Sequence, residues 1–182
     1  MKKIVFIVAM VLFTISIEAQ KGEINWISLE EAVEAQAVSP KKIMMDVYTS
    51  WCGPCKLLDR NTFQNPDVVK YVNEHYYAVK FNAEGNEKVN FKNYLFENPD
   101  YDPNRTGRNA QHQLAGALRI TAYPTIVFFN ESGETLLPLP GYKTPSQLEL
   151  YLKLFLNNDH EKINSQEQWN QYQKDFVSQF RG

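Results

Sequence analysis

The chain has 182 residues, of which 43% are hydrophobic and 22% are charged, as in an ordinary globular protein. This length predicts one domain with room for a small appendage. The formal net charge is −2, so no basic field indicates a nucleic-acid partner.

The first 19 residues have the pattern of a secretory signal peptide. Met1-Lys2-Lys3 is positively charged, residues 4–17 form an apolar run, and Glu18-Ala19-Gln20 ends it. The run is shorter than the roughly 20 residues that a membrane-spanning helix needs. We therefore expect cleavage after Ala19 and export, to the periplasm in a bacterium with two membranes. The alternative is an uncleaved anchor that holds the protein on the periplasmic side.

Helix and strand patterns alternate in the first half of the chain. Ser28 and Glu31 form a capping box, which predicts a helix towards Val38. The stretch "KIMMDVYTS" reads as a buried strand, and "CKLLDRNTFQNPDVVKYVNEHY" has helical spacing that Asn65-Pro66 is expected to kink or split. A second strand follows at "YYAVKFNAE".

A polar stretch over residues 84–112 is too long for an ordinary connection. We interpret it as an insertion, either disordered or facing the substrate, with a short helix at "VNFKNYLF". The acidic spacing in "DYDPN" suggests calcium, but the full binding-loop pattern and its final glutamate are missing.

The second half of the chain predicts a hairpin between helices. "QLAGALRI" reads as a helix, "TAYPTIVFFN" as the third strand and "ESGE" as a turn. "TLLPLPGY" is the fourth strand, and its two prolines favour a sheet edge. "TPSQLELYLKLFL" is an amphipathic helix. This order predicts an α/β fold, a mixed sheet with helices on both faces.

A separate helix is expected from Ser165 onwards. Trp169, Tyr172, Phe176 and Phe180 fall at helical spacing there, and we expect this aromatic stripe to pack on its own domain rather than bind a partner. The predicted division is therefore a domain over residues 20–158 and a C-terminal helical extension over residues 159–182.

Cys52 and Cys55 are the only cysteines, and two residues separate them. A disulfide that merely staples the chain is disfavoured, because so short a loop constrains the unfolded chain little. A structural zinc site needs four ligands, whereas there is no second cysteine pair and His75, His112 and His160 lack ligand spacing. A redox-active pair is the favoured interpretation.

The pair lies where a strand passes into a helix. The N–H groups and the positive dipole end of a helix N-terminus lower the pKa of a thiol below its usual ~8.5. This predicts Cys52 as the thiolate nucleophile and Cys55, one turn later and deeper, as the resolving thiol. Pro54 suits a first helical turn, and Gly53 is expected to let the backbone turn tightly beside the sulfurs.

Three stretches, "IMMDVYTSWCGPCK", "YYAVKFNAE" and "RITAYPTIVFFNESGE", stand in the order typical of the thioredoxin family. The chain resembles the exported, thioredoxin-like branch of that family over roughly residues 25–158, apart from the insertion. The resemblance implies a thioredoxin fold, with the insertion placed before a cis-proline, and the activity of a thiol:disulfide oxidoreductase.

The resemblance also implies two catalytic roles behind the cysteines. Asp46 matches a buried aspartate that relays a proton to or from Cys55, and Lys80 matches the lysine that pairs with it. A buried carboxylate needs such a partner or it stays protonated. The alternatives are that Asp46 only caps the following turn and that Lys80 is an exposed strand residue.

We expect Trp51, Gly53, Pro54, Tyr123 and Pro124 to form the substrate-binding surface. Pro124 matches the family's cis-proline, which implies a cis Tyr123–Pro124 bond and Tyr123 backbone groups that pair with a substrate strand. Tyr123 departs from the small aliphatic residue that is frequent there. Trp51 could instead be a packing residue, and Gly141, which matches a glycine near the site, could be a plain turn residue.

The implied reaction is dithiol–disulfide exchange with protein substrates, without a bound cofactor or metal. Gly53-Pro54 resembles the reducing members of the family, so we expect a reductase supplied by a membrane-bound electron donor. A disulfide-forming oxidase is the alternative enzyme. A peptide-binding or chaperone module without redox turnover is the alternative from another class, but a pure binder has no need of the cysteine pair.

Overall fold

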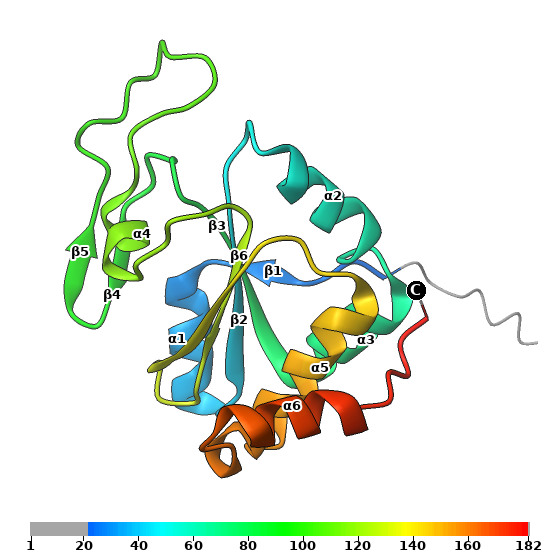
Figure 1. Cartoon of the computed structure of the whole chain (residues 1–182). Helices are drawn as coiled ribbons and strands as arrows, with labels where there is room; N and C mark the ends of the chain where they lie inside the picture. The colour runs from blue at the N-terminus through cyan, green and yellow to red at the C-terminus, as the bar shows by residue number, and fades with distance from the viewer. Residues whose placement is uncertain (1–21, 182) are drawn as a thin grey trace, which may run out of the picture.

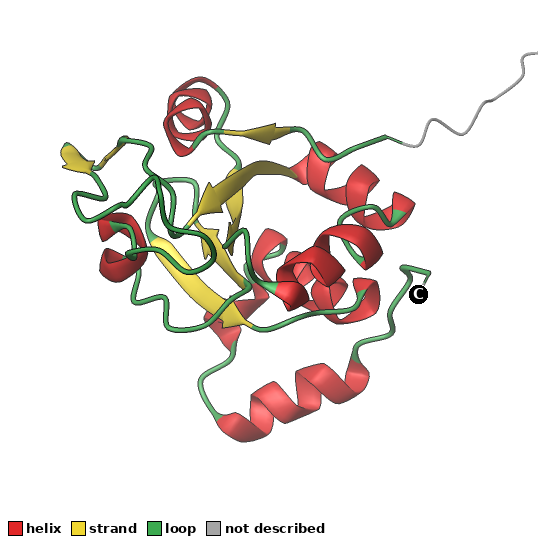
Figure 2. Ribbon diagram, turned by 90° about the horizontal axis from the view of Figure 1, so that it is seen from above, coloured by secondary structure: helices red, strands yellow, loops and turns green. Residues whose placement is uncertain are grey.

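The structure, a computed structural model, describes residues 22–181, so the expected signal peptide lies outside the described residues. A mixed five-stranded sheet lies between layers of helices (Figures 1 and 2), which confirms the predicted α/β class. No helix within residues 22–181 is both long and apolar enough to cross a membrane.

The central sheet has the strand order β1-β3-β2-β6-β7. Its members are β1 (Trp26–Ile27), β2 (Lys42–Tyr48), β3 (Tyr76–Asn82), β6 (Thr125–Phe129) and β7 (Thr135–Pro140). β2 runs parallel to β3 and antiparallel to β6. The proline-containing β7 lies at an edge, as predicted, whereas the two-residue β1 at the other edge was not predicted.

The helices cover both faces of this sheet. They are α1 (Leu29–Val38), α2 (Gly53–Asn61), α3 (Pro66–His75), α4 (Gln113–Ala117), α5 (Pro145–Leu156) and α6 (Gln166–Asp175), with a 3-10 turn, η1 (Asp159–Lys162). Residues of α1 and α4 pack on the face that carries Met45, and residues of α2, α3 and α5 pack on the face that carries Met44. Because side chains alternate along a strand, Asp46 points to the same face as Met44, beneath α2.

The long helical stretch after the cysteines is split, as predicted. α2 ends at Asn61, and α3 begins after Asn65, whose side-chain oxygen accepts the N–H groups of Asp67 and Val68. Pro66 occupies the first turn of α3, where its missing N–H costs nothing.

The predicted short helix in the insertion is wrong. Residues 89–96 form a hairpin of β4 (Val89–Phe91) and β5 (Tyr94–Phe96). Val89 and Phe91 are buried and Asn90 is exposed, a period of two. Lys92 and Asn93 have φ angles of 53° and 61°, and positive φ at both central residues suits a two-residue hairpin turn.

The C-terminal helix begins after its cap, Ser165, and packs on its own domain, as expected. The helix ends at Asp175, so Phe176 and Phe180 lie beyond it. The prediction that the four aromatic residues form one stripe on a single helix is therefore wrong. Phe180 nevertheless reaches the core, where its ring centroid lies 5.5 Å from that of Tyr71.

Candidate active site: a cysteine pair at a helix N-terminus

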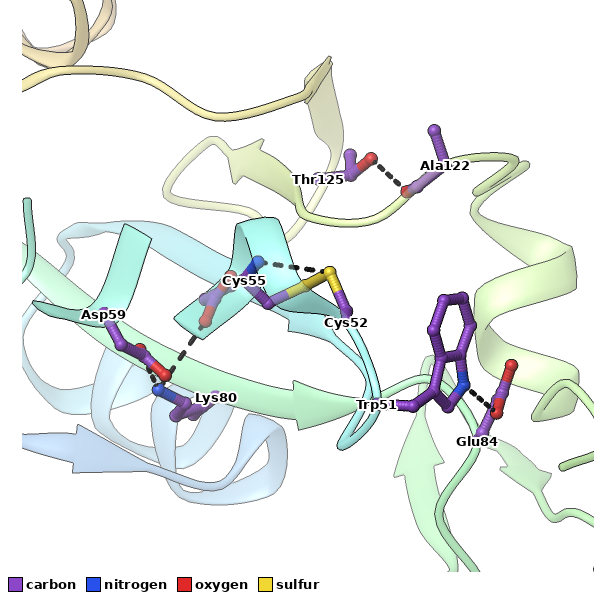
Figure 3. Close-up of a disulfide and its surroundings, with 9 residues drawn as sticks. Trp51, Cys52, Cys55, Asp59, Lys80, Glu84, Ala122 and Thr125 are labelled. Carbon is purple, nitrogen blue, oxygen red and sulfur yellow. Dashed lines mark hydrogen bonds and ion pairs between the residues drawn. A yellow bond between two sulfur atoms is a disulfide. The ribbon is translucent and has the colours of Figure 1, made fainter. Parts of the chain in front are cut away.

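Cys52 and Cys55 form a disulfide, and both lie at the start of α2 (Figure 3). Cys52 is the N-cap residue, and its Sγ accepts the backbone N–H of Cys55 at 3.1 Å. This contact lets one of the otherwise unpaired N–H groups of the first turn face the Cys52 sulfur. In the reduced protein, the same N–H and the positive helix end would stabilise a thiolate at Cys52.

The two cysteines are equally buried, at 2% and 3% exposure. In this disulfide form, solvent exposure therefore does not distinguish Cys55 as the deeper residue. The distinction that remains is chemical, since Cys52 caps the helix and Cys55 belongs to its first turn.

Gly53 and Pro54 are exposed in front of the sulfurs. A Cβ added at Gly53 would meet no atom within 4 Å, and Gly53 is not among the residues with positive φ. The tight turn that was expected to use the conformational freedom of Gly53 therefore does not draw on it. What the glycine provides is an open surface beside the disulfide.

Asp46 and Lys80 are brought together as the resemblance implies. They are paired across β2 and β3, and the Lys80 Nζ lies 3.7 Å from the Asp46 Oδ2. The sequence reasoning missed the third member: the same Nζ donates a hydrogen bond to Asp59 Oδ1 (Figure 3). Asp59 lies four residues after Cys55 on α2, and that i,i+4 spacing could have indicated it.

Burial raises the pKa of Asp46 from 3.8 to about 7. The loss of water around the buried carboxyl outweighs the ammonium of Lys80, which lowers this pKa, and the carboxylate of Asp59 adds to the rise. Asp46 therefore exchanges a proton near neutral pH, which suits a group that accepts a proton from a thiol.

Lys80, the cation beside Asp46, borders a cavity. A cavity of about 260 Å³ is lined by Trp26, Asp59, Phe63 and Lys80, among others. The side chain of Lys80 is 26% exposed, whereas that of Asp46 is 2% exposed. Lys80 therefore lies beside the buried carboxyl and also reaches the solvent.

The Tyr123–Pro124 bond is cis, as the resemblance implies. Tyr123 lies next to the cysteine loop, because its ring centroid is 6.1 Å from that of Trp51. Among residues 22–181, neither the N–H nor the C=O of Tyr123 has a hydrogen-bond partner. Gly141 has a φ of 82°, which favours glycine, and its N–H donates to the Pro124 carbonyl at 2.8 Å, so it serves both the turn and the site.

Trp51 is held by a residue of the insertion. Its Nε1 donates to Glu84 Oε2 at 2.7 Å (Figure 3), and the guanidinium of Arg108 lies 4.5 Å from its ring centroid. Sequence reasoning did not single out Glu84 or Arg108. No local pattern could have found Arg108, because the path of the insertion places it there.

The histidines have separate structural surroundings. His112 is buried, and its Nδ1 accepts the N–H of Leu114 as the cap of α4. His75 and His160 pack against the rings of Tyr71 and Phe155. The described residues contain no cluster of three His, Cys, Asp or Glu side chains able to hold a metal.

The family model of the thioredoxin-like domain matches residues 29–156. The thiol:disulfide interchange protein DsbD of Pectobacterium atrosepticum is 27% identical over 123 residues, which are 66% of this chain and 18% of that protein. The DsbD of Photorhabdus laumondii is 27% identical over 112 residues, 62% of this chain and 15% of that protein. The chain thus spans less than a fifth of the length of these curated relatives.

Solved structures share the fold. A thioredoxin-fold protein from Helicobacter pylori superposes with a TM-score of 0.58 at 20% identity, over 74% of this chain and 81% of that one. A candidate disulphide isomerase from Bacteroides thetaiotaomicron gives a TM-score of 0.51 at 28% identity, over 73% of this chain and 93% of that one. The predicted thioredoxin fold is confirmed. The chain therefore belongs to the family of thioredoxin-like domains, and it carries a Cys52–Cys55 disulfide at the start of α2.

Proposed function

We propose that the protein is an exported reductase that breaks disulfide bonds in protein substrates by exchange through Cys52 and Cys55. The observation that carries this proposal is the Cys52–Cys55 disulfide at the N-terminus of α2, with Asp46 buried beneath that helix. The basic and apolar start of the sequence supports export to the periplasm and removal of residues 1–19.

The first step is attack by the Cys52 thiolate on a substrate disulfide. A mixed disulfide forms between Cys52 and one substrate sulfur, and the other substrate sulfur leaves as a thiolate. The Cys55 N–H that contacts Cys52 Sγ favours the thiolate form before attack.

The second step resolves the mixed disulfide. Cys55 gives its proton to Asp46 and attacks Cys52 Sγ, and the second substrate sulfur leaves. Two electrons have then passed from the protein to the substrate, and the protein carries the Cys52–Cys55 disulfide. A membrane-bound dithiol donor would return two electrons and two protons for the next cycle.

The substrate binds as an added strand beside Tyr123. The unpartnered N–H and C=O of Tyr123 support this binding mode, because an extended peptide pairs with free backbone groups at an edge. Trp51, Gly53, Pro54 and Pro124 form the surface around the exchanging sulfurs.

Reduction of insulin by dithiothreitol, with and without the protein, tests this function. We expect the protein to accelerate insulin precipitation, and Cys52→Ser to abolish the acceleration. The reduction potential, measured against glutathione, tests the direction: a reductase should lie near thioredoxin's ~−270 mV. No acceleration would contradict the exchange activity, and a potential near ~−120 mV would identify an oxidase instead.

A further inference from the structure

The insertion is anchored at both ends next to the cysteine loop. The Ala83 N–H donates to the Tyr48 carbonyl, and the His112 N–H donates to the Ala83 carbonyl, both at 2.8 Å. The side-chain amide of Asn98 donates to the carbonyls of Gly85 and Ala110, at 2.9 and 2.8 Å, and so joins the two arms. The insertion is therefore fixed relative to the redox site, and the expectation of disorder is wrong.

Glu84, at the start of the insertion, joins Trp51 to Asn109, near the end of the insertion. Its Oε2 accepts both the Trp51 Nε1–H and the Asn109 N–H, each at 2.7 Å. Two residues further on, the Gln111 amide donates to the hydroxyl of Tyr123 at 3.1 Å. The insertion thus touches both aromatic residues that flank the cysteine pair.

Arg108 directly precedes Asn109 in the chain and is exposed. Its guanidinium lies over the face of Trp51, at 4.5 Å from the ring centroid. Within residues 22–181, Arg108 forms no ion pair and its side chain donates no hydrogen bond. An arginine stacked on an aromatic ring is held in place while its planar set of donors stays free for a carboxylate.

We propose that Arg108 is a substrate-binding residue that favours proteins with an acidic side chain next to the disulfide that exchanges with Cys52. This inference rests on the proposed function, because it assumes that substrates dock beside Trp51 and Tyr123. Glu84 keeps its negative charge, because both of its hydrogen-bond donors are neutral, but it is half-buried, whereas Arg108 is exposed to a docking substrate. The first turn of α2 adds no acidic residue that would oppose it.

The test uses three synthetic peptides that each contain one disulfide and differ only in the residue beside the first cysteine: Glu, Gln or Lys. The reduced protein is mixed with each peptide, and kcat/KM is divided by the rate constant with dithiothreitol alone, which removes the peptide's own reactivity. Wild-type protein should prefer the Glu peptide over the Lys peptide by about two- to fivefold, the range of an exposed ion pair. Added salt should weaken this preference.

Variants then assign the preference to Arg108. Arg108→Ala should bring the ratio of normalised kcat/KM for the Glu peptide to that for the Lys peptide close to one. Arg108→Glu should bring this ratio below one. Arg105→Ala is the matched control, because Arg105 is also exposed on the insertion but Arg108 is the arginine whose guanidinium lies over Trp51, and Arg105→Ala should keep the wild-type ratio. A wild-type ratio of one, or an unchanged ratio in Arg108→Glu, would overturn the inference. If wild type reduces none of the peptides, the Gln peptide included, it is the proposed function that fails.

Discussion

Asp46 has a pKa near neutrality because its carboxyl is buried in the core and its one nearby cation, Lys80, is shared with Asp59. Lys80 lies 3.7 Å from Asp46 but donates its hydrogen bond to Asp59. A carboxyl that is protonated in the folded protein and ionised in the unfolded chain binds the extra proton only when folded. Its contribution to stability is therefore largest at low pH and falls as the pH rises from about 3.8 to about 7.

Asp46→Asn removes this dependence. The free energy of unfolding of the variant relative to wild type should grow between pH 4 and pH 8, by on the order of 4 kcal/mol if the whole shift is expressed. Urea denaturation of the oxidised proteins at several pH values measures it. Asp100→Asn, at an exposed position, should follow wild type throughout. A difference that does not change with pH would rule out a raised pKa at Asp46.

Asp59→Asn should shift the pH profile of thiol–disulfide exchange towards lower pH. The change removes a negative charge that raises the pKa of Asp46, and it frees Lys80 to pair with Asp46. Asp46 should then accept a proton at lower pH, and turnover at pH 6 should rise relative to turnover at pH 8. The pH profile of insulin reduction tests this, with Asp100→Asn again as control, and an unshifted profile would remove Asp59 from the mechanism.

At the scale of elements, one buried carboxylate holds the C-terminal segment. Glu149 of α5 is fully buried and pairs with Lys153 at 2.6 Å. Its Oε2 also accepts hydrogen bonds from the Ser178 hydroxyl at 2.5 Å and from the N–H groups of Gln179 and Phe180 at 2.8 Å. Burial alone would raise the pKa of Glu149, but the hydrogen bonds from Lys153 and Ser178 hold it below its usual 4.5.

Glu149→Gln should release this segment, because an amide cannot form an ion pair with Lys153. Its NH2 group would also face the hydrogen-bond donors of Ser178, Gln179 and Phe180. We expect a loss of about 1–3 kcal/mol in the free energy of unfolding and faster proteolysis after α6. Because folding lowers the pKa of Glu149, its carboxylate stabilises the folded protein above pH 4.5. This stabilisation should fade as the pH drops below 4.5. Glu161→Gln, at an exposed position, is the control, and equal proteolysis of both variants would contradict the anchor.

The elements that could be predicted from the sequence are those whose signals are local. The caps Ser28 and Ser165 and the Asn65–Pro66 break each act within a turn, and each marks a helix end where predicted. The insertion could not be predicted, because the hydrogen bonds that shape it join residues far apart, such as Asn98 and Ala110. The tail after Asp175 likewise follows a partner on another helix rather than its own helical spacing.

Across the whole molecule, the proposed chemistry gathers at one end of the sheet. The exit of β2, the start of α2, the start of β6 and the base of the insertion meet there, and α6 packs near the other end (Figure 1). Order along the chain and family resemblance predicted the cysteine pair with Asp46, Lys80 and Pro124. Asp59 was missed, although its spacing from Cys55 on α2 could have indicated it. The contributions of Glu84 and Arg108 depend on packing between elements, which the sequence alone does not show.

The central claim is that Cys52 attacks substrate disulfides and Cys55 resolves the product. Trapping with Cys55→Ser tests it most directly. The reduced variant is mixed with a disulfide-bonded protein such as insulin, and the adducts are mapped by non-reducing electrophoresis and peptide mass analysis. We predict a stable mixed disulfide on Cys52, and much less adduct from Cys52→Ser. Adducts on Cys55 in Cys52→Ser as abundant as those on Cys52 in Cys55→Ser, or none in either variant, would contradict the account.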